Sequence, residues 1–347
     1  MNIACLVRLK PADAEAIRAI DPSIKLTEAG GWFDGEFKET WPAGTARRYV
    51  PGEGAGTRGE RDALLAEADI VVSGFPYPMD LYARAPRLRW MHQTPAGASN
   101  LRNGDIWGKP VLVTTSRGLG EVLAIAEYAI SGLLYVAKGF DIAVDQRARG
   151  ELSHPDYSAV SALRGKTLCV IGAGGIGREV GRLGHALGMR VVGTRNTLTL
   201  SEADACFERI VPPPNLHAEL ALSDFVAVCC QWTDATTNLL DDAAFAALKP
   251  GAAIVNVARG EIIDEDALVR ALAADRIRGA VLDVYVGEFE GPPRTEFQQE
   301  PRVLLTPHTS NKTDASDRGD QALFRDNLRR FLNGEALLNQ VDWTRGY

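Results

Sequence analysis

Three glycines, Gly172, Gly174 and Gly177, follow a short apolar run and have the spacing G-x-G-x-x-G. A helical pattern and a second apolar run come after them. In such a unit the first glycine permits a tight turn, the second lets a pyrophosphate approach the backbone, and the third lets the helix pack on the strand. The amides of Gly175 and Ile176 would open a helix whose N-terminus attracts anions. The segment predicts a dinucleotide site; the alternative is a purely structural turn.

The end of the second apolar run indicates which dinucleotide binds. A carboxylate there would accept a hydrogen bond from the ribose 2′-hydroxyl, but no acidic residue occurs between Glu179 and Glu202. Arg195 and Asn196 stand near the expected acidic position instead. A guanidinium suits a 2′-phosphate, which favours NADP(H), with NAD(H) possible. In the alternative interpretation Arg195 is a solvated surface residue and NAD(H) binds with little discrimination.

Three polar residues, Arg259, Glu288 and His308, each follow a later apolar run. Ligands bind at the carboxyl ends of parallel strands, so these side chains could share one site. Together they suit the reduction of a 2-keto acid: the arginine binds the carboxylate and polarises the carbonyl, and the histidine, kept charged by the glutamate, gives a proton as hydride arrives. Each residue alone is weak evidence for a catalytic site, because each has an ordinary structural alternative. Arg259 could cap a turn beside Asp264. Glu288 could be a surface residue near Glu290, and His308 could be a loop residue.

The elements that must position these residues alternate short apolar runs with helical stretches, which is typical of parallel α/β sheets. The expected strands cover residues 3–7, 70–73, 88–91, 111–114, 167–171, 190–193, 225–229, 253–256, 279–283 and 303–305. The expected helices include 11–20, 62–67, 121–137 and about 314–332. The Gly- and Trp-rich stretch 30–59 is predicted to be a long loop, with one possible strand at 47–50.

The chain of 347 residues is too long for one core, which seldom exceeds ~250–300 residues. Because the last helix follows the closing strand of the second series, we expect it to pack back on the first domain. The predicted fold is therefore α/β with two doubly wound parallel-sheet domains. A Rossmann-type nucleotide domain, 118–311, is inserted in a flavodoxin-like substrate domain made of 1–117 and 312–347.

Composition excludes several classes of function. A net charge of -7 without a long basic run argues against a nucleic-acid partner. The longest apolar run, 122–137, is interrupted by Glu127 and falls short of the ~18 residues of a membrane helix. The first ten residues read as a strand and show no signal peptide. The five cysteines include no CxxC, and the histidines lack metal-ligand spacing, so we expect neither disulfides nor a metal site. Free thiols predict a reducing, cytoplasmic location.

Four segments in order, VIGAGGIGREV, VNVARGEIIDEDALVRAL, GAVLDVYVGE and LLTPH, resemble the D-isomer-specific 2-hydroxyacid dehydrogenase family. The similarity covers about residues 86–340, and the ordered set is far more specific than any single segment. The resemblance implies that Arg259 is the substrate-binding and catalytic arginine, His308 the acid/base and Glu288 its partner. It also implies the remaining members of the cofactor site: Asp283, which would contact the nicotinamide carboxamide, with Cys230 and Ala258.

The resemblance further implies a substrate loop whose backbone amides hold the carboxylate. The matching stretch here is TPAGASNL, which assigns this role to Ala96 and Gly97, with Ser99 where the family usually has aspartate. Tyr77 is a further candidate for the substrate pocket; alternatively it packs within its own domain. In the family the helix near 121–138 packs across a two-fold axis, which implies a homodimer.

We therefore expect an oxidoreductase that transfers a hydride between NADP(H) and a small 2-keto acid or (R)-2-hydroxy acid. Glyoxylate and hydroxypyruvate are the leading substrates. An alternative of another class is a dinucleotide-sensing binding protein, similar to a corepressor, that retains a dehydrogenase site. A third interpretation keeps the enzyme but gives it a phosphorylated or inorganic acid as substrate.

Overall fold

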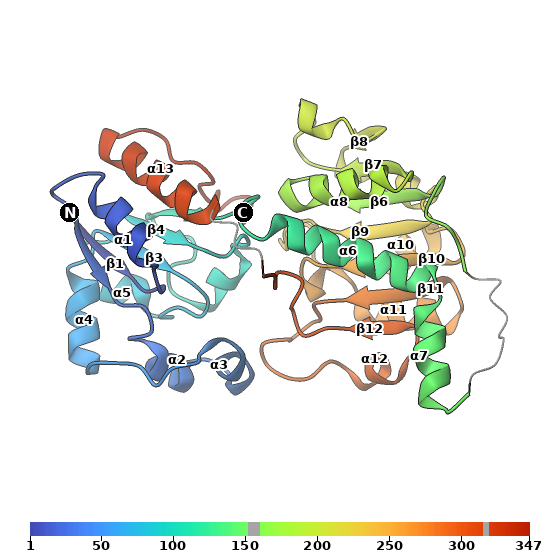
Figure 1. The fold of residues 1–347 in the computed structure, drawn as a ribbon, viewed down its shortest axis with the longest axis horizontal. Coiled ribbons are helices and arrows are strands. Elements are labelled where there is room, and N and C mark those ends of the chain that lie inside the picture. Colours follow the sequence, from blue (N-terminus) through green and yellow to red (C-terminus); the bar gives the residue numbers. More distant parts are fainter. Residues whose placement is uncertain (152–159, 315–318) are drawn as a thin grey trace. The chain divides into compact units, whose positions relative to one another are not determined.

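The computed structural model describes residues 1–151, 160–314 and 319–347 (Figure 1). The chain divides into two compact units, each built on a parallel sheet. Unit 1 comprises Met1–Gly120, Phe289–Gly291 and the C-terminal segment with α13 (Gly319–Asn333), and unit 2 comprises Glu121–Glu288 and the segment from Pro292 to the last described residue before α13. The predicted fold class, two parallel α/β domains, is confirmed. The domain boundaries predicted at 117/118 and 311/312 stay predictions.

Unit 1 has a five-stranded parallel sheet in the order β2-β1-β3-β4-β5, which is the flavodoxin-like order. The strands are β1 (Asn2–Cys5), β2 (Lys25–Glu28), β3 (Ile70–Ser73), β4 (Trp90–Gln93) and β5 (Leu112–Thr115). The helices outside the 30–59 stretch are α1 (Pro11–Arg18), α4 (Arg58–Ala66), α5 (Leu81–Arg84) and α13. The edge strand β2 was not predicted, because its sequence KLTE is polar and only partly buried.

Much of the stretch 30–59 is helical, although residues 50–57 form a loop, so the prediction of one long loop is wrong for residues 34–49 and the predicted strand at 47–50 is not formed. It contains α2 (Asp34–Thr40) and α3 (Ala43–Tyr49), and it leads into α4. Phe33, Phe37 and Trp41 recur at every fourth residue and are buried. This spacing places them on one helical face, which packs into the core of unit 1 although glycines interrupt the stretch.

Unit 2 has a seven-stranded parallel sheet in the order β12-β11-β10-β9-β6-β7-β8. The strands are β6 (Thr167–Ile171), β7 (Arg190–Thr194), β8 (Arg209–Val211), β9 (Phe225–Val228), β10 (Ala252–Asn256), β11 (Ile277–Leu282) and β12 (Val303–Leu305). The chain reverses its direction of travel across the sheet at β6, where Ile171 pairs with Thr194 on one side and with Val228 on the other. Such a switch point is where open α/β sheets bind dinucleotides.

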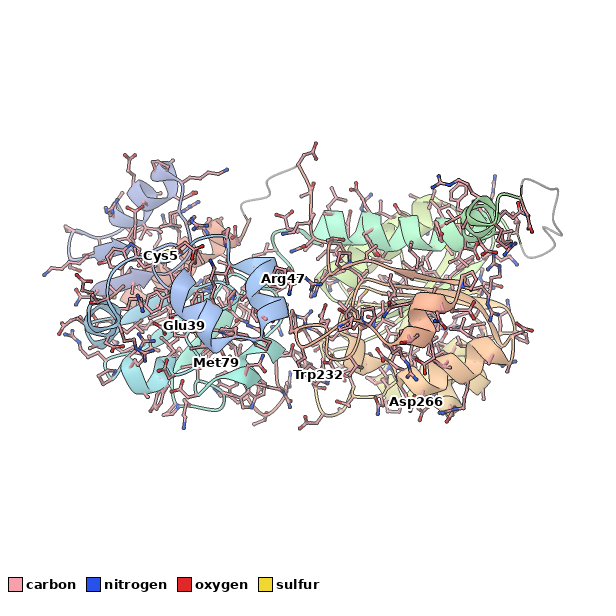
Figure 2. The ribbon with its side chains drawn as sticks, turned by 90° about the horizontal axis from the view of Figure 1, so that it is seen from below. Cys5, Glu39, Arg47, Met79, Trp232 and Asp266 are labelled. Carbon is pink, nitrogen blue, oxygen red and sulfur yellow. The ribbon has the colours of Figure 1, made fainter. Side chains whose placement is uncertain are left out.

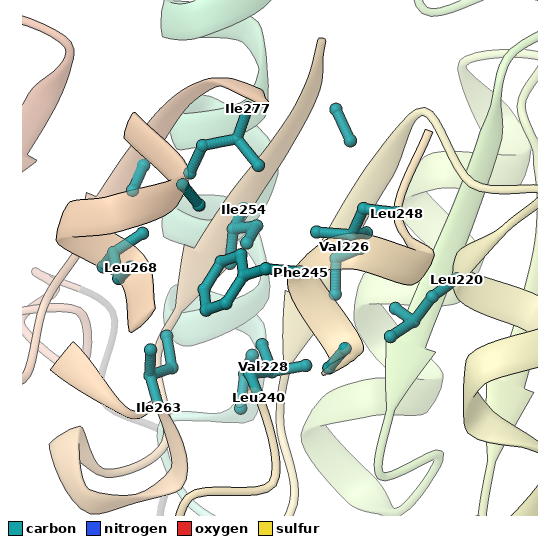
Figure 3. Close-up of a cluster of buried hydrophobic side chains, with 14 of the residues drawn as sticks. Leu220, Val226, Val228, Leu240, Phe245, Leu248, Ile254, Ile263, Leu268 and Ile277 are labelled. Atoms are coloured by element: carbon teal, nitrogen blue, oxygen red, sulfur yellow. The ribbon is translucent and has the colours of Figure 1, made fainter. Parts of the chain in front are cut away.

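Helices cover both faces of the unit 2 sheet (Figure 1). They are α6 (Val122–Ala137), α7 (Phe140–Ala148), α8 (Gly175–Ala186), α9 (Leu216–Leu220), α10 (Asp242–Ala247), α11 (Glu265–Ala273) and α12 (Thr295–Gln299). On one face Phe245 of α10 lies among Val226, Ile254 and Leu268 (Figure 3). No single described helix is long and apolar enough to cross a membrane, although α6 and α7, bent by 67°, pass that test as a pair.

His92 of β4 gives unit 1 a pH-dependent stability. It is buried beside Phe324, and its Nδ1 lies 2.8 Å from Thr114 Oγ1. Burial lowers the pKa of His92 from 6.5 to about 4. The unfolded chain therefore binds this proton at a higher pH than the folded chain, and stability falls as the pH drops from about 6.5 to about 4.

We expect wild-type protein to lose about 2 kcal/mol more unfolding free energy than His92→Gln between pH 7 and pH 4.5, because glutamine does not titrate. Urea unfolding followed by tryptophan fluorescence at both pH values measures the difference. Equal losses in the two proteins would show that His92 does not carry this pH dependence.

Candidate functional site

The turn between β6 and α8 has the geometry that a bound pyrophosphate requires. Gly172 has φ +93°, and a Cβ there would lie 2.5 Å from Cys230 Cα. A Cβ on Gly177 would lie 2.1 Å from the Gly172 carbonyl oxygen, whereas the Cβ position of Gly174 has no atom within 4 Å. The first and third glycines thus allow close packing, and the second leaves an open approach to the start of α8. The residues present therefore fit a dinucleotide, with Gly175 and Ile176 in the first turn of α8.

Cys230, which follows β9 by two residues, packs against the glycine turn. Burial raises the pKa of its thiol to about 12, so the side chain stays neutral and acts as a small lining group. Trp232 follows in the same loop (Figure 2), and its indole N–H donates to Thr237 Oγ1 at 2.9 Å. This loop, CQWT in sequence, therefore places Cys230 against the glycine turn and holds Trp232 in a defined orientation.

Arg195 follows β7, but none of its N–H donors is available to a cofactor bound at the glycine turn. A guanidinium has five N–H donors, and all five have partners here. Nη1 donates to Ala173 O at 3.1 Å and to Asp204 Oδ1 at 2.9 Å, and Nη2 donates to Thr199 O at 3.0 Å and Asp204 Oδ2 at 3.3 Å. Nε donates to the carbonyl oxygen of Thr197. The Arg195 side chain therefore holds the loop after β7 in place by binding three of its residues, Thr197, Thr199 and Asp204.

Asp204 is shared by two arginines. Arg178 of α8 donates through Nε at 2.8 Å and Nη2 at 3.2 Å, and Arg195 binds the same carboxylate. Burial opposes ionisation of Asp204, but the hydrogen bonds from Arg178 and Arg195 outweigh it and hold its pKa well below the ordinary value. Two guanidinium charges against one carboxylate leave a net positive cluster next to Asn196 at the end of β7.

Arg259 lies just beyond β10, and two neighbours fix its backbone. Asn256 is buried and bridges the turn, because its Nδ2 donates to Arg259 O at 2.9 Å and its Oδ1 accepts from Ala258 N at 3.0 Å. A Cβ on Gly260 would lie 2.1 Å from Tyr285 C, so this glycine lets the turn pack against the chain after β11. Sequence reasoning missed Asn256 and Gly260; the signal was an asparagine at the end of a buried strand, three residues before Arg-Gly.

The structure brings His308 and Glu288 together. His308 Nδ1 lies 2.9 Å from Glu288 Oε1 and 3.0 Å from Oε2. The glutamate side chain is 4% exposed and the imidazole 20% exposed, whereas Glu290 is exposed. A buried carboxylate at this distance accepts a hydrogen bond from a protonated Nδ1 and fixes the orientation of the ring. Since the carboxylate faces Nδ1, a proton given to a substrate would leave from Nε2.

Asp283 holds the turn that carries His308. Its buried carboxylate accepts from Thr306 Oγ1 at 2.6 Å, Thr309 N at 2.7 Å and Ser310 N at 2.9 Å. Its carbonyl oxygen accepts from His308 N at 2.8 Å. The expected contact of Asp283 with a nicotinamide carboxamide stays a prediction.

The three predicted catalytic residues lie at the same edge of the sheet. The strands β10, β11 and β12 are neighbours and parallel, and Arg259, Glu288 and His308 follow their respective carboxyl ends. A cation and a His–carboxylate pair at one edge can bind a carboxylate and donate a proton beside it. Among the residues that the structure describes, no group of three or more His, Cys, Asp or Glu could hold a metal.

The predicted substrate residues of unit 1 have different surroundings. Ala96 and Gly97 lie in the loop after β4, where Gln93 Nε2 donates to Gly97 O at 2.6 Å. Tyr77 is 0% exposed, and its hydroxyl donates to Leu101 O at 3.1 Å. This placement matches the alternative in which Tyr77 packs within its own domain, and it does not support a substrate contact.

Residues 130–310 match the family described as D-isomer specific 2-hydroxyacid dehydrogenase, NAD binding domain. The chain is 28% identical over 288 residues to D-3-phosphoglycerate dehydrogenase of Methanocaldococcus jannaschii, covering 82% of this chain and 54% of that protein. It is 29% identical over 310 residues to glyoxylate reductase of Thermococcus gammatolerans, covering 86% and 87%. The chain thus spans about half the length of the first relative and most of the second.

A solved structure shares the fold. The D-isomer specific 2-hydroxyacid dehydrogenase from Xanthobacter autotrophicus Py2, in complex with NADPH and MES, superposes with a TM-score of 0.75 at 24% identity. The superposition covers 100% of this chain and 99% of that one. At this identity the likeness concerns the arrangement of the two parallel-sheet domains.

Proposed function

Because the chain belongs to the D-isomer specific 2-hydroxyacid dehydrogenase family, we propose that it reduces a small 2-keto acid to the (R)-2-hydroxy acid with NADPH. The observation that carries this proposal is the contact of His308 Nδ1 with both oxygens of Glu288, at the sheet edge that also carries Arg259. The glycine turn after β6 offers the dinucleotide site in the same unit.

The reaction needs a hydride at the carbonyl carbon and a proton at the carbonyl oxygen. The bound dinucleotide supplies the hydride. Arg259 would bind the substrate carboxylate and polarise the carbonyl, so that the π electron pair moves to oxygen as the hydride arrives. His308 would release its Nε2 proton to that oxygen and become neutral, while Glu288 stabilises the charged imidazole beforehand. Water would then return the proton to His308.

Glyoxylate and hydroxypyruvate are the proposed substrates. A relative named glyoxylate reductase aligns along 86% of this chain and 87% of its own length, which supports a short unphosphorylated acid. The phosphoglycerate dehydrogenase alignment supports a phosphorylated acid but covers 54% of that protein.

The test is absorbance at ~340 nm, the band of reduced nicotinamide, with NADPH and NADH in parallel. The panel is glyoxylate, hydroxypyruvate, pyruvate, phenylpyruvate and 3-phosphohydroxypyruvate. Fastest turnover of the first two with NADPH is the expected result. Tight dinucleotide binding without turnover of any acid would instead favour a dinucleotide-sensing protein.

The preference for NADPH would rest on the net positive cluster around Asp204. All donors of Arg195 are used inside the protein, whereas Arg178 is 35% exposed and its Nη1 has no hydrogen-bond partner among the described residues. We therefore assign the 2′-phosphate contact to Arg178 and the ordering of the loop to Arg195. The earlier expectation that Arg195 itself reads the phosphate becomes the alternative.

Arg178→Ala is expected to raise KM for NADPH about 10- to 100-fold and to leave KM for NADH nearly unchanged, because it removes one charge-assisted contact to a group that NADH lacks. Steady-state kinetics with both cofactors give the ratio. Arg182→Ala, on the next turn of α8, is the matched control, since Arg182 pairs with Glu179 at the surface. An equal rise for both cofactors would contradict the assignment.

We also propose a homodimer in which α6 and α7 face the second copy. Three large apolar side chains on these helices are strongly exposed: Leu123 at 49%, Phe140 at 54% and Val144 at 54%. Light scattering coupled to size exclusion is expected to give twice the chain mass of 37.5 kDa, and a stable monomer would overturn this proposal.

A further inference from the structure

A chain of three side chains runs from α6 to the turn that carries His308. The Tyr128 hydroxyl on α6 is hydrogen-bonded to Thr306 Oγ1, and Thr306 Oγ1 donates to Asp283 Oδ1 at 2.6 Å. Thr306 directly follows β12 and Asp283 directly follows β11. The three residues therefore join one helix and two neighbouring strands at the edge where the candidate site lies.

Chemistry fixes the direction of every hydrogen bond in this chain. A carboxylate only accepts, so Thr306 must use its single hydroxyl proton on Asp283. Thr306 can then only accept from Tyr128, and the tyrosine must be the donor. Tyr128 stays protonated for this role, because burial and the nearby Asp283 raise its pKa to about 12. Both hydrogen bonds of this series are therefore present at any pH at which the enzyme would work.

Asp283, the last of the three side chains, binds residues on both sides of His308. Asp283 accepts from the Thr306 hydroxyl, which precedes His308, and from the amides of Thr309 and Ser310, which follow it. Between these contacts His308 has φ +52°, a left-handed conformation that non-glycine residues avoid. A side chain in this conformation must be held by its surroundings, and Asp283 provides the contacts that do so.

We propose that Tyr128 and Thr306 are positioning residues that act through Asp283 to keep the His308 imidazole against Glu288. This proposal rests on the role given above to His308 as proton donor. Neither residue touches the imidazole itself, so their effect is on its orientation. Loss of the Thr306 hydroxyl would leave the Asp283 carboxylate bound only to the amides after His308, so that the segment before His308 is held less firmly and the imidazole can turn away from Glu288.

The central variant is Thr306→Val, which keeps the shape of the side chain and removes its hydroxyl. We expect kcat to fall about 10- to 30-fold, because small misplacements of a catalytic group are costly, with KM for the keto acid and the Kd of NADPH within about 2-fold of wild type. Thr306→Ser restores the hydroxyl and is expected to restore kcat. Tyr128→Phe removes only the outermost donor and is expected to lower kcat about 3-fold.

Tyr135→Phe is the matched control. Tyr135 lies on the same helix and packs on Phe140, away from the chain of hydroxyls, so kcat is expected to stay at the wild-type value. A general weakening of α6 would affect both tyrosine variants, whereas a positioning role affects Tyr128→Phe alone.

A second readout does not require turnover. The chain has 5 histidines, and the ring signals of His308 in ¹⁵N-histidine NMR can be assigned by comparison with His308→Asn. Thr306→Val is expected to move or broaden the His308 signals, and Thr306→Ser to return them. If no acid is turned over, the proposed function fails while this spectrum still tests the positioning role.

The proposal is overturned if Thr306→Val keeps both wild-type kcat and the wild-type His308 signals. It is also overturned if kcat, KM and the unfolding midpoint all change in Thr306→Val and serine restores none of them, because that pattern reports a fold defect. Tyr128→Phe gives an independent test should Thr306→Val fail to fold, and a Tyr128→Phe protein that matches Tyr135→Phe would remove the tyrosine from the proposal.

Discussion

Replacing His308 by asparagine is expected to lower kcat about 1,000-fold while NADPH binds as before. General acid catalysis by a positioned side chain contributes about 10²- to 10⁴-fold, and asparagine cannot supply the proton. Asparagine is preferable to alanine here because His308 has φ +52°, a conformation that asparagine tolerates. The variant therefore removes the acid and keeps the turn that Asp283 holds.

Stopped-flow turnover and NADPH fluorescence titration measure the two quantities separately. Glu288→Gln is the companion variant, because it preserves a hydrogen-bond partner for Nδ1 and removes the charge that stabilises the imidazolium. Its kcat should lie between those of wild type and His308→Asn. Wild-type kcat in His308→Asn would exclude His308 from proton transfer, and a matching loss of NADPH binding would show that the variant had damaged the cofactor site.

The residues that sequence reasoning found are those whose signal is local. The glycine turn could be predicted because strand, turn and helix are contiguous, and the sterics at Gly172 and Gly177 follow from that unit alone. The fully buried strand β6 and the edge strand β12 are both apolar runs in sequence, and they were predicted with their observed bounds. The partly exposed edge strands β2 and β8 lack such a run and were missed.

The roles that sequence reasoning could not assign depend on contacts between distant segments. Arg195 stands where a phosphate reader is expected, but its donors are taken by Asp204 and by three carbonyl oxygens. Tyr128 and Thr306 are 178 residues apart in the chain, and only the packing of α6 on the sheet brings their hydroxyls together. Residue type predicts which interactions a side chain can form, whereas the folded contacts determine which of them it forms.

Arg259→Ala is expected to lower kcat/KM about 10²- to 10⁴-fold, the second large effect at the site. The guanidinium would make two charge-assisted hydrogen bonds to the substrate, each worth about 1.5–3 kcal/mol. Asn256 and Gly260 fix the backbone of the turn through contacts that do not involve the Arg259 side chain, whose Nη1 donates to Ala258 O at 2.7 Å, so the unfolding midpoint of Arg259→Ala is measured beside its kinetics. Binding of NADPH should be nearly unaffected, because the glycine turn lies after another strand.

Arg259→Lys separates charge from geometry. Lysine keeps the positive charge but lacks the planar fork, so a site that needs bidentate recognition should recover only a small part of the lost kcat/KM. Steady-state kinetics of both variants with the fastest keto acid, together with NADPH titration, give the comparison. Near-complete recovery in Arg259→Lys would mean that Arg259 acts as a point charge. An unchanged kcat/KM in Arg259→Ala would exclude Arg259 as the group that binds the substrate carboxylate. The two variants therefore distinguish a side chain that orients the substrate from one that only attracts it.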